Sequence, residues 1–354
     1  MRSSKNHIPS IDGLRAVAVL FVVLSHLSVT RSLTEKWNQY IGWFIDGKTG
    51  VDIFFIISGF LITLLLLTER EKYGSVNLKN FYIRRVLRIF PAFYCYLGFI
   101  LILSILGQIE VSSRALLASA LYIYNFNISE PNWYVNHSWS LGVEEQFYIL
   151  FPVFILRLKL GQARIAWIIS LIVGSAMRAL YYKFPENSSY FLSGFFLHAD
   201  FLATGCYIGF LYSYKRDWLR EISKKMTPII PFIAIAAILL VYSFQYHPVL
   251  DIVLIPLGRT STNLSIGIVL IYYIFPRQSP VYDVLNASPM TWLGRLSYSL
   301  YLWQQYFISG KDKMISSFPQ NLAILFVVSI ASYYLIERPF LLFKSKFTPD
   351  RDIQ

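Results

Sequence analysis

The sequence predicts an all-α integral membrane protein with about ten transmembrane helices and both termini in the cytoplasm. Three observations support this fold class. Hydrophobic residues make up 55% of the 354 residues and charged residues only 15%, whereas soluble domains carry about a quarter charged residues. Apolar runs long enough to cross a bilayer recur from one end of the chain to the other. Lys and Arg gather in alternate connecting segments.

Ten apolar runs are long enough to be spans. They cover residues 12–30, 50–67, 89–107, 140–156, 164–182, 196–212, 228–245, 252–275, 291–308 and 321–338. They lack the period-two alternation of barrel strands, so helices are expected. An eleventh stretch, 115–124, is too short to cross and is expected to be interfacial or re-entrant.

The distribution of basic residues sets the topology. With both termini inside, the cytoplasmic segments and the span ends that adjoin them hold 22 Lys and Arg, and the outer loops hold 7. Cytoplasmic loops are enriched in these residues, so the net charge of +12 reflects topology and not nucleic-acid binding. Residues 1–354 are expected to form a single membrane domain. Cys95 and Cys206, both in apolar runs, are expected to be small hydrophobes and not a disulfide.

Four ionisable residues are predicted near the outer ends of their spans, where burial is costly and often functional. They are His26, Asp52, Glu144 and Glu145. A buried histidine can be purely structural, and Asp52 can be a helix N-terminal carboxylate that the helix dipole favours. Two adjacent carboxylates in hydrocarbon need a polar cavity or a protonated state. Together the four residues form a candidate acid–base site.

Four arginines are predicted near the cytoplasmic face. Arg15 precedes His26 by about three helical turns, so the two point the same way roughly 16 Å apart. Arg84, Arg85 and Arg88 precede the third span and share one side of a helix. They can be topology anchors that reach the headgroups or a phosphate site. An anion site inside and an acid–base site outside would suit acyl transfer from a phosphate-rich cytoplasmic donor to an outer hydroxyl.

Only one of the paired glutamates is expected to meet His26, because adjacent helical residues point about 100° apart. Glu144 has Tyr148 four residues further on, a polar lining of the same face. Glu145 shares its face with Ile149, which indicates lipid or core. The sequence therefore favours Glu144 as the partner of the imidazole.

Other polar positions receive structural interpretations. Arg178 and Asp200 are expected to form an interhelical ion pair. Ser58 and Gly59 are expected to allow close helix packing. No metal site is predicted.

Six motifs resemble, in their order, the acyltransferase-3 family of bacterial membrane O-acyltransferases. They are IDGLRAVAVLFVVLSH, GVDIFFIISGFLIT, FYIRRVLRIFP, SWSLGVEEQFYILFP, SYSLYLW and IERPF. The resemblance covers nearly the whole chain. It implies ten helices in the inner membrane and acyl-CoA as co-substrate, with acetyl-CoA as the favoured donor. It also implies a carbohydrate acceptor such as O-antigen, capsule or exopolysaccharide.

The resemblance also assigns residues. Arg15 and His26 match its arginine–histidine element, the three arginines before span three match its cytoplasmic arginine element, and the paired glutamates match a family pair. Many relatives continue SYSLYLW with histidine, whereas this chain has Gln304, so no role of that histidine is carried over.

The mechanism that the resemblance implies places the phosphates of acyl-CoA on the cytoplasmic arginines and the acyl group near His26. His26 then acts as general base or as nucleophile, and a glutamate orients it. A transporter or flippase of a lipid-linked sugar is the alternative, although inverted repeats, typical of many transporters, are not evident. A non-catalytic membrane scaffold is a third, which the paired buried glutamates disfavour.

Overall fold

The computed structural model describes residues 8–30, 45–126, 128–184, 194–244, 250–308 and 318–347, and every regular element within these ranges is helical. The longer helices are α1 (Ile11–Val29), α3 (Gly47–Tyr73), α4 (Leu78–Ile105), α6 (Ser138–Ile155), α7 (Leu160–Lys183), α9 (Ala199–Tyr214), α11 (Ile229–Phe244), α13 (Arg259–Tyr273), α15 (Ser288–Phe307) and α16 (Gln320–Ser332). The shorter ones are α5 (Ser113–Ala120), α10 (Arg216–Lys225), α12 (Asp251–Val253), α14 (Pro280–Asn286) and α17 (Arg338–Lys344).

Short irregular turns complete the described fold. Three are 3-10 turns, η1 (Tyr124–Phe126), η2 (Trp133–Val135) and η5 (Ser345–Phe347). Two π-helical turns, η3 (Leu254–Gly258) and η4 (Tyr333–Glu337), join α12 to α13 and α16 to α17.

Each of the ten predicted runs coincides with a helix, and the run at 115–124 contains only the short α5. Among the residues that the structure describes, six segments are long and apolar enough to cross a membrane: α1, α3, α4, α7, α12 through α13, and α16 through η5. A seventh results if α10 and α11, which meet at 85°, form one bent span. The multi-pass membrane class is therefore confirmed, and the count of ten stays a prediction.

Helices α9 and α15 fall outside these six for physical reasons. A helix of 16 residues, as in α9, is about 24 Å long, shorter than the hydrocarbon core of about 30 Å. Helix α15 is long enough, but several of its buried side chains are polar, including Ser297, Ser299, Gln304 and Gln305. These polar groups face protein and not lipid.

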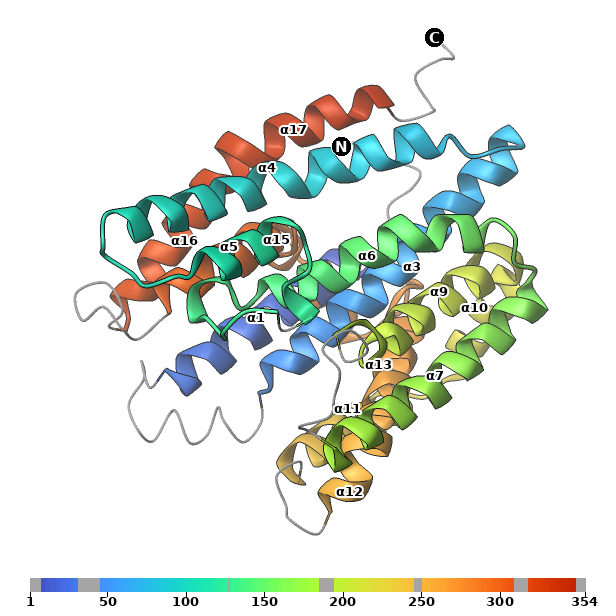
Figure 1. Ribbon diagram of the computed structural model, residues 1–354. Helices are drawn as coiled ribbons and strands as arrows, with labels where there is room; N and C mark the ends of the chain where they lie inside the picture. The colour runs from blue at the N-terminus through green and yellow to red at the C-terminus, as the bar shows by residue number, and fades with distance from the viewer. Residues whose placement is uncertain are drawn as a thin grey trace.

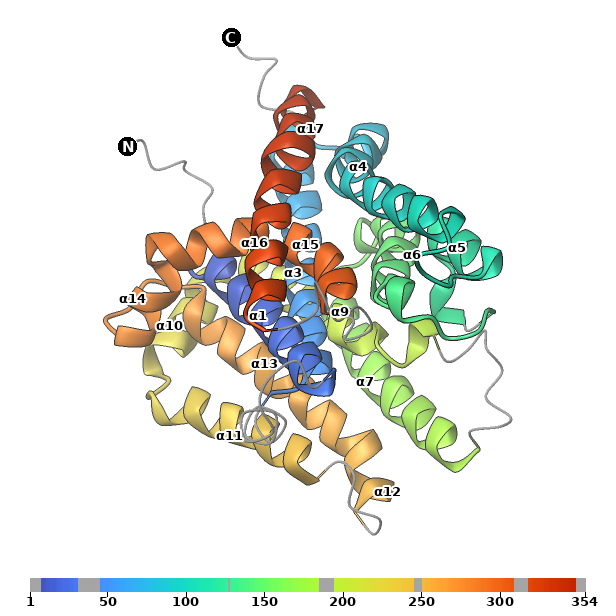
Figure 2. The ribbon, with the colours of Figure 1, turned by 90° about the vertical axis from the view of Figure 1, so that its left-hand side faces the viewer.

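Helix α3 runs through the middle of the fold, with α4, α16 and α17 on one side and α7, α11 and α13 on the other (Figure 1). In the view turned by 90°, α4 and α17 lie at the top and α7, α11 and α13 in the lower half, while α16 overlaps α3 (Figure 2). Helix α7 is the least buried of the six segments. Its exposed residues include Ile165, Ile169 and Ile172. An exposed face of this composition is what lipid contact requires.

Close helix contacts form where glycine leaves room. A Cβ atom at Gly205 of α9 would lie 2.0 Å from the carbonyl oxygen of Ile56, and one at Gly59 of α3 would lie 2.1 Å from that of Leu202. Any larger residue at either position would therefore push the two helices apart. The packing role predicted for Gly59 is confirmed.

A tight turn links α3 to α4. Gly74 adopts a positive φ of 73° after α3, and the Asn77 side chain accepts from the Asn80 amide at 3.0 Å to cap α4. Helix α4 therefore begins 11 residues before the predicted run at 89–107. The three basic residues expected ahead of this span lie inside the helix.

Candidate active site

The described helices enclose a cavity of about 380 Å³ between α1, α3, α4, α6 and α15, closed on one side by η4 and α17. Its charged lining side chains are Arg15, Arg85, Arg88, Arg295, Lys344, Glu144 and Glu337. Five of these are basic and two acidic, so the lining carries an excess of positive charge. Like charges gathered around one cavity repel one another, and an anionic ligand would offset that repulsion.

The arginines of the cavity are held by different contacts. Arg15 donates from Nη2 to Ser297 Oγ of α15 at 3.0 Å. The guanidinium of Arg85 lies over the rings of Tyr148 and Phe81, 5.3 and 5.6 Å from their centroids, a cation–π arrangement. Both arginines line the cavity, and guanidinium forks are suited to binding anions.

Arg84 departs from the prediction that the three arginines of α4 act together. Its Nη2 forms a buried ion pair with Glu69 Oε2 at 2.8 Å, and its Nη1 donates to the carbonyl oxygen of Phe347 at 2.7 Å. Glu69 also accepts from the Asn77 amide at 2.9 Å. Arg84 therefore locks the turn between α3 and α4, while Arg85 and Arg88 line the cavity.

Glu144 lies in the cavity wall, bonded to two hydroxyl groups. Ser58 donates to its Oε1 at 2.8 Å and Tyr148 to its Oε2 at 3.2 Å. The predicted polar face shared by Glu144 and Tyr148 is confirmed, whereas Ser58 serves as a donor and not only as a small packing residue. Glu145 is buried, outside the cavity lining, and Ile149 is exposed as lipid contact requires.

His26 contacts α15 and neither glutamate. Its Nδ1 lies 2.5 Å from Oε1 of Gln304, and its ring centroid lies 5.2 Å from that of Trp133. The prediction that Glu144 is the imidazole partner is therefore wrong. Glu144 points into the cavity, whereas Gln304 lies one helical turn beyond the cavity residue Tyr301.

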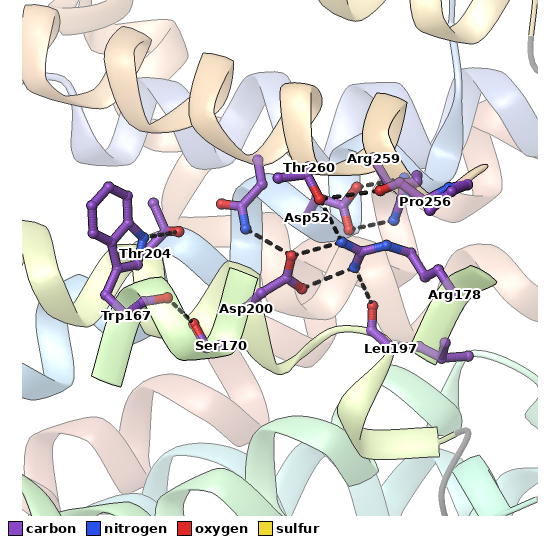
Figure 3. Close-up of polar contacts among 11 residues, drawn as sticks. Asp52, Trp167, Ser170, Arg178, Leu197, Asp200, Thr204, Pro256, Arg259 and Thr260 are labelled. Carbon is purple, nitrogen blue, oxygen red and sulfur yellow. Dashed lines mark hydrogen bonds and ion pairs between the residues drawn. The ribbon is translucent and has the colours of Figure 1, made fainter. Parts of the chain in front are cut away.

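Asp52 is placed away from the cavity, in a second polar cluster (Figure 3). It forms a double contact with Arg259, from Nη2 to Oδ1 at 2.9 Å and from Nη1 to Oδ2 at 2.7 Å. A carboxylate paired in this way is committed to a structural contact. The structure therefore does not bring the four residues of the predicted acid–base site together: Glu144 lines the cavity, while His26, Asp52 and Glu145 do not.

The predicted pair of Arg178 and Asp200 is confirmed in the same cluster, with Nη–Oδ distances of 3.1 and 3.0 Å. Arg178 also donates to Thr260 Oγ1 at 2.9 Å, and Asn263 donates to Asp200 at 3.1 Å. The cluster ties α7 and α9 to α13. Charge is balanced within it, which favours a role in helix packing.

Several residues of the cavity carried no sequence signal of their own. Glu337, in the IERPF motif, accepts a hydrogen bond from Ser299. This bond joins the cavity wall formed by η4 to the wall formed by α15. Lys344 lies in a basic tail that reads equally well as a topology anchor. Only the IERPF motif pointed to Glu337, and nothing in the spacing of either residue predicts that it lines a cavity with residues of α1 and α4.

The cysteines are free thiols, Cys95 exposed and Cys206 buried, as predicted. Within the described ranges, no three His, Cys, Asp or Glu side chains lie close enough to hold a metal ion.

The family model for the acyltransferase domain matches residues 8–338, which include every residue that lines the cavity except Leu341 and Lys344. The chain belongs to the acyltransferase-3 family. This family assignment covers α1 through the first residue of α17 and thus nearly the whole described fold.

Members of the acyltransferase-3 family with curated names are similar to this chain. The peptidoglycan O-acetyltransferase OatA of Listeria monocytogenes is 29% identical over 96% of this chain and 56% of its own length. A Staphylococcus aureus protein, provisionally named an O-acetyltransferase, is 27% identical over 94% of this chain and 57% of its own. The chain thus spans about half the length of the curated relatives it matches. No solved structure matches it.

Proposed function

We propose that this protein is a membrane O-acyltransferase that moves an acyl group from acyl-CoA to a hydroxyl group of an envelope carbohydrate. Acetyl is the acyl group that we favour. The cationic cavity is the observation that carries this proposal. The CoA moiety bears several phosphate groups, and Arg15, Arg85 and Arg88 line one cavity. Guanidinium forks bind phosphate oxygens through charge-assisted hydrogen bonds.

The proposed topology has ten spans in the bacterial inner membrane with both termini in the cytoplasm. In this topology Arg15 lies at the cytoplasmic end of α1 and His26 near its outer end, about 16 Å away along the helix axis. A donor held at the arginines would then reach the outer half of the membrane through the cavity. The carbohydrate acceptor would approach from the opposite side.

The chain's own residues supply the chemistry around the thioester of the donor. In the direct route, the imidazole of His26 takes the proton of the acceptor hydroxyl as that oxygen attacks the acyl carbon and the thiol leaves. In the two-step route, a nitrogen of His26 attacks the acyl carbon and the CoA thiolate leaves. The acceptor hydroxyl then attacks the acyl-imidazole, the imidazole is released, and the proton of the hydroxyl neutralises the thiolate. Both routes need a neutral imidazole nitrogen with a free electron pair.

The names of the relatives favour peptidoglycan among the envelope carbohydrates. The Listeria protein is named a peptidoglycan O-acetyltransferase, and a Bacillus subtilis protein, 28% identical over 84% of this chain, carries the same name provisionally. O-antigen, capsule and exopolysaccharide are the other acceptors that the test below distinguishes.

The rival function is transport of a lipid-linked sugar, because a diphosphate would also suit the cationic cavity. The two functions differ in whether a covalent bond forms. Membranes that contain the protein are incubated with acetyl-CoA labelled in the acetyl group, and peptidoglycan and other envelope glycans are then isolated. We expect base-labile label in peptidoglycan, absent from membranes with the His26→Ala variant. Flipping of a lipid-linked sugar with no label in any glycan would overturn the proposal.

A further inference from the structure

Two consecutive glutamines of α15 connect His26 to the backbone of η2. His26 Nδ1 lies 2.5 Å from Oε1 of Gln304. Nε2 of Gln304 donates to Oε1 of Gln305 at 3.0 Å, and Nε2 of Gln305 donates to the carbonyl oxygen of Trp133 at 2.6 Å. Both glutamines are almost completely buried, with exposed fractions of 0% and 1%.

These contacts form a row of hydrogen bonds from His26 through Gln304 and Gln305 to Trp133. The direction of each bond follows from the last one, at Trp133. The backbone carbonyl of Trp133 can only accept a hydrogen bond. The amide group of Gln305 must therefore turn its NH₂ toward Trp133, which leaves its oxygen facing Gln304. Gln304 must in turn present its NH₂ to that oxygen, so its own oxygen faces His26.

A second carbonyl enforces the same orientation of Gln304. Its Nε2 also approaches the carbonyl oxygen of Tyr301, at 3.5 Å and on the same helix. If the amide were reversed, its oxygen would face both this carbonyl and Oε1 of Gln305. Two such oxygen–oxygen contacts in a buried site would cost a desolvated acceptor each.

We propose that Gln304 and Gln305 are positioning residues that hold the neutral imidazole of His26 with its proton on Nδ1 and its electron pair on Nε2. The oxygen of Gln304 can only accept, so Nδ1 must be the donor. Nε2 is then the nitrogen that takes the hydroxyl proton or the acyl group, a consequence that rests on the proposed function. In other histidine sites a carboxylate fixes the tautomer in this way, whereas here a neutral amide does so.

Trp133 is positioned to keep the row in register. Its indole Nε1 donates to the carbonyl oxygen of Gln305 at 2.7 Å. Its ring lies against the imidazole at an interplanar angle of 59°. Segment η2 and helix α15 are therefore joined by two hydrogen bonds in opposite directions, next to the residue that they orient.

The tautomer can be measured directly. The full-length protein is labelled with ¹⁵N in the rings of its five histidines and studied by NMR in lipid nanodiscs, at a pH where the His26 ring is neutral. The signals of His26 are assigned by their absence in His26→Ala. We expect a protonated, pyrrole-type Nδ1 and an unprotonated, pyridine-type Nε2. A proton on Nε2, or an equal mixture of tautomers, would overturn the proposal whatever the enzymatic activity.

Variants test the role of the row. Gln304→Leu and Gln305→Leu should each shift His26 to a mixture of tautomers. The first removes the acceptor of Nδ1, and the second leaves the amide of Gln304 free to turn. Gln304→His should keep the wild-type tautomer, because an imidazole can accept at one nitrogen and donate at the other. Gln146→Leu removes another amide, partly buried and bonded to Asn125 and Tyr122, and is the control. It should leave the His26 signals unchanged.

Activity separates this inference from the proposed function. If acetyl transfer occurs, Gln304→Leu should lower kcat by about tenfold, the effect of one lost hydrogen bond, and Gln304→His should restore most of it. If the NMR spectra are as expected but neither the wild type nor any variant transfers acetyl, the proposed function is refuted and the positioning role is not. Transfer that survives Gln304→Leu at the wild-type rate would refute the positioning role.

Discussion

Arg15 and His26 lie on one helix, and each contacts α15. Arg15 reaches Ser297 at 3.0 Å and His26 reaches Gln304 at 2.5 Å. The earlier residue of α1 contacts the earlier residue of α15, and the later residue contacts the later one. The two helices therefore run parallel. One helix pair therefore holds the cationic cavity and the histidine at a fixed separation, which a transfer between the two requires.

His26→Ala is expected to abolish acyl transfer while the protein still accumulates in the membrane. The substitution removes the only imidazole bonded to Gln304 in the described part of the chain, and the lost contacts are polar and local. Label incorporated from acetyl-CoA into glycan, normalised to protein in the membrane, measures the effect. Near-normal incorporation would remove His26 from the mechanism.

Arg85→Ala should raise the KM for acyl-CoA by roughly ten- to a hundredfold, because a charge-assisted hydrogen bond contributes about 1.5–3 kcal/mol. Arg85→Lys should recover only part of the loss, since a point charge lacks the fork geometry. Initial rates at varied acyl-CoA concentration are the measurement. An unchanged KM would make Arg85 a topology anchor.

Arg84→Ala is the matched comparison from the same helix and should act on stability and not on the donor. It leaves Glu69 as an unpaired buried carboxylate, a change that costs about 3–5 kcal/mol in other proteins. Thermal unfolding in detergent should show a lower midpoint, with the KM for acyl-CoA close to wild type in the protein that folds. A raised KM at unchanged stability would contradict this division of roles.

The paired glutamates should differ in the same kind of experiment. Glu144→Gln removes a charge from the cavity wall and weakens its bonds to Ser58 and Tyr148, so we expect a roughly tenfold or greater loss of kcat with normal protein levels. Glu145→Gln changes a residue outside the cavity lining and should leave turnover per molecule near wild type. Full activity of both variants would remove the paired glutamates from the mechanism.

Asp200→Asn should destabilise the protein without changing the donor site. It leaves Arg178 without its buried counter-ion, at a cost of about 3–5 kcal/mol, and thermal unfolding reports the loss. Glu221→Gln breaks the exposed ion pair with Lys224 and serves as control, because exposed pairs contribute little. Equal unfolding midpoints for both variants would show that the buried cluster is not a packing device.

Sequence patterns predicted correctly what depends on one helix at a time. The helical class, the position of a helix in every apolar run and the shared face of Glu144 and Tyr148 all follow from periodicity and hydropathy. The pair of Arg178 and Asp200 was also predicted, because two opposite charges inside apolar runs have few other ways to be satisfied.

Partners between helices were harder to predict. Glu144 was matched with His26 because both lie at a similar depth, yet depth does not specify rotation about a helix axis or which neighbour each face meets. The structure assigns Gln304 to His26 and two hydroxyl groups to Glu144. It pairs Asp52 with Arg259, more than two hundred residues away in the chain.

The sequence by itself thus determined that this is a helical membrane protein of the acyltransferase-3 family and which residues carry charge into its interior. Only the tertiary structure decided which of those charges meet. Arg85 and Arg88 line a cavity while Arg84, on the same helix, holds a turn. The physical reason is that hydropathy and helical spacing constrain the residues of one helix, whereas a cavity is made by side chains from several helices whose packing no local pattern encodes.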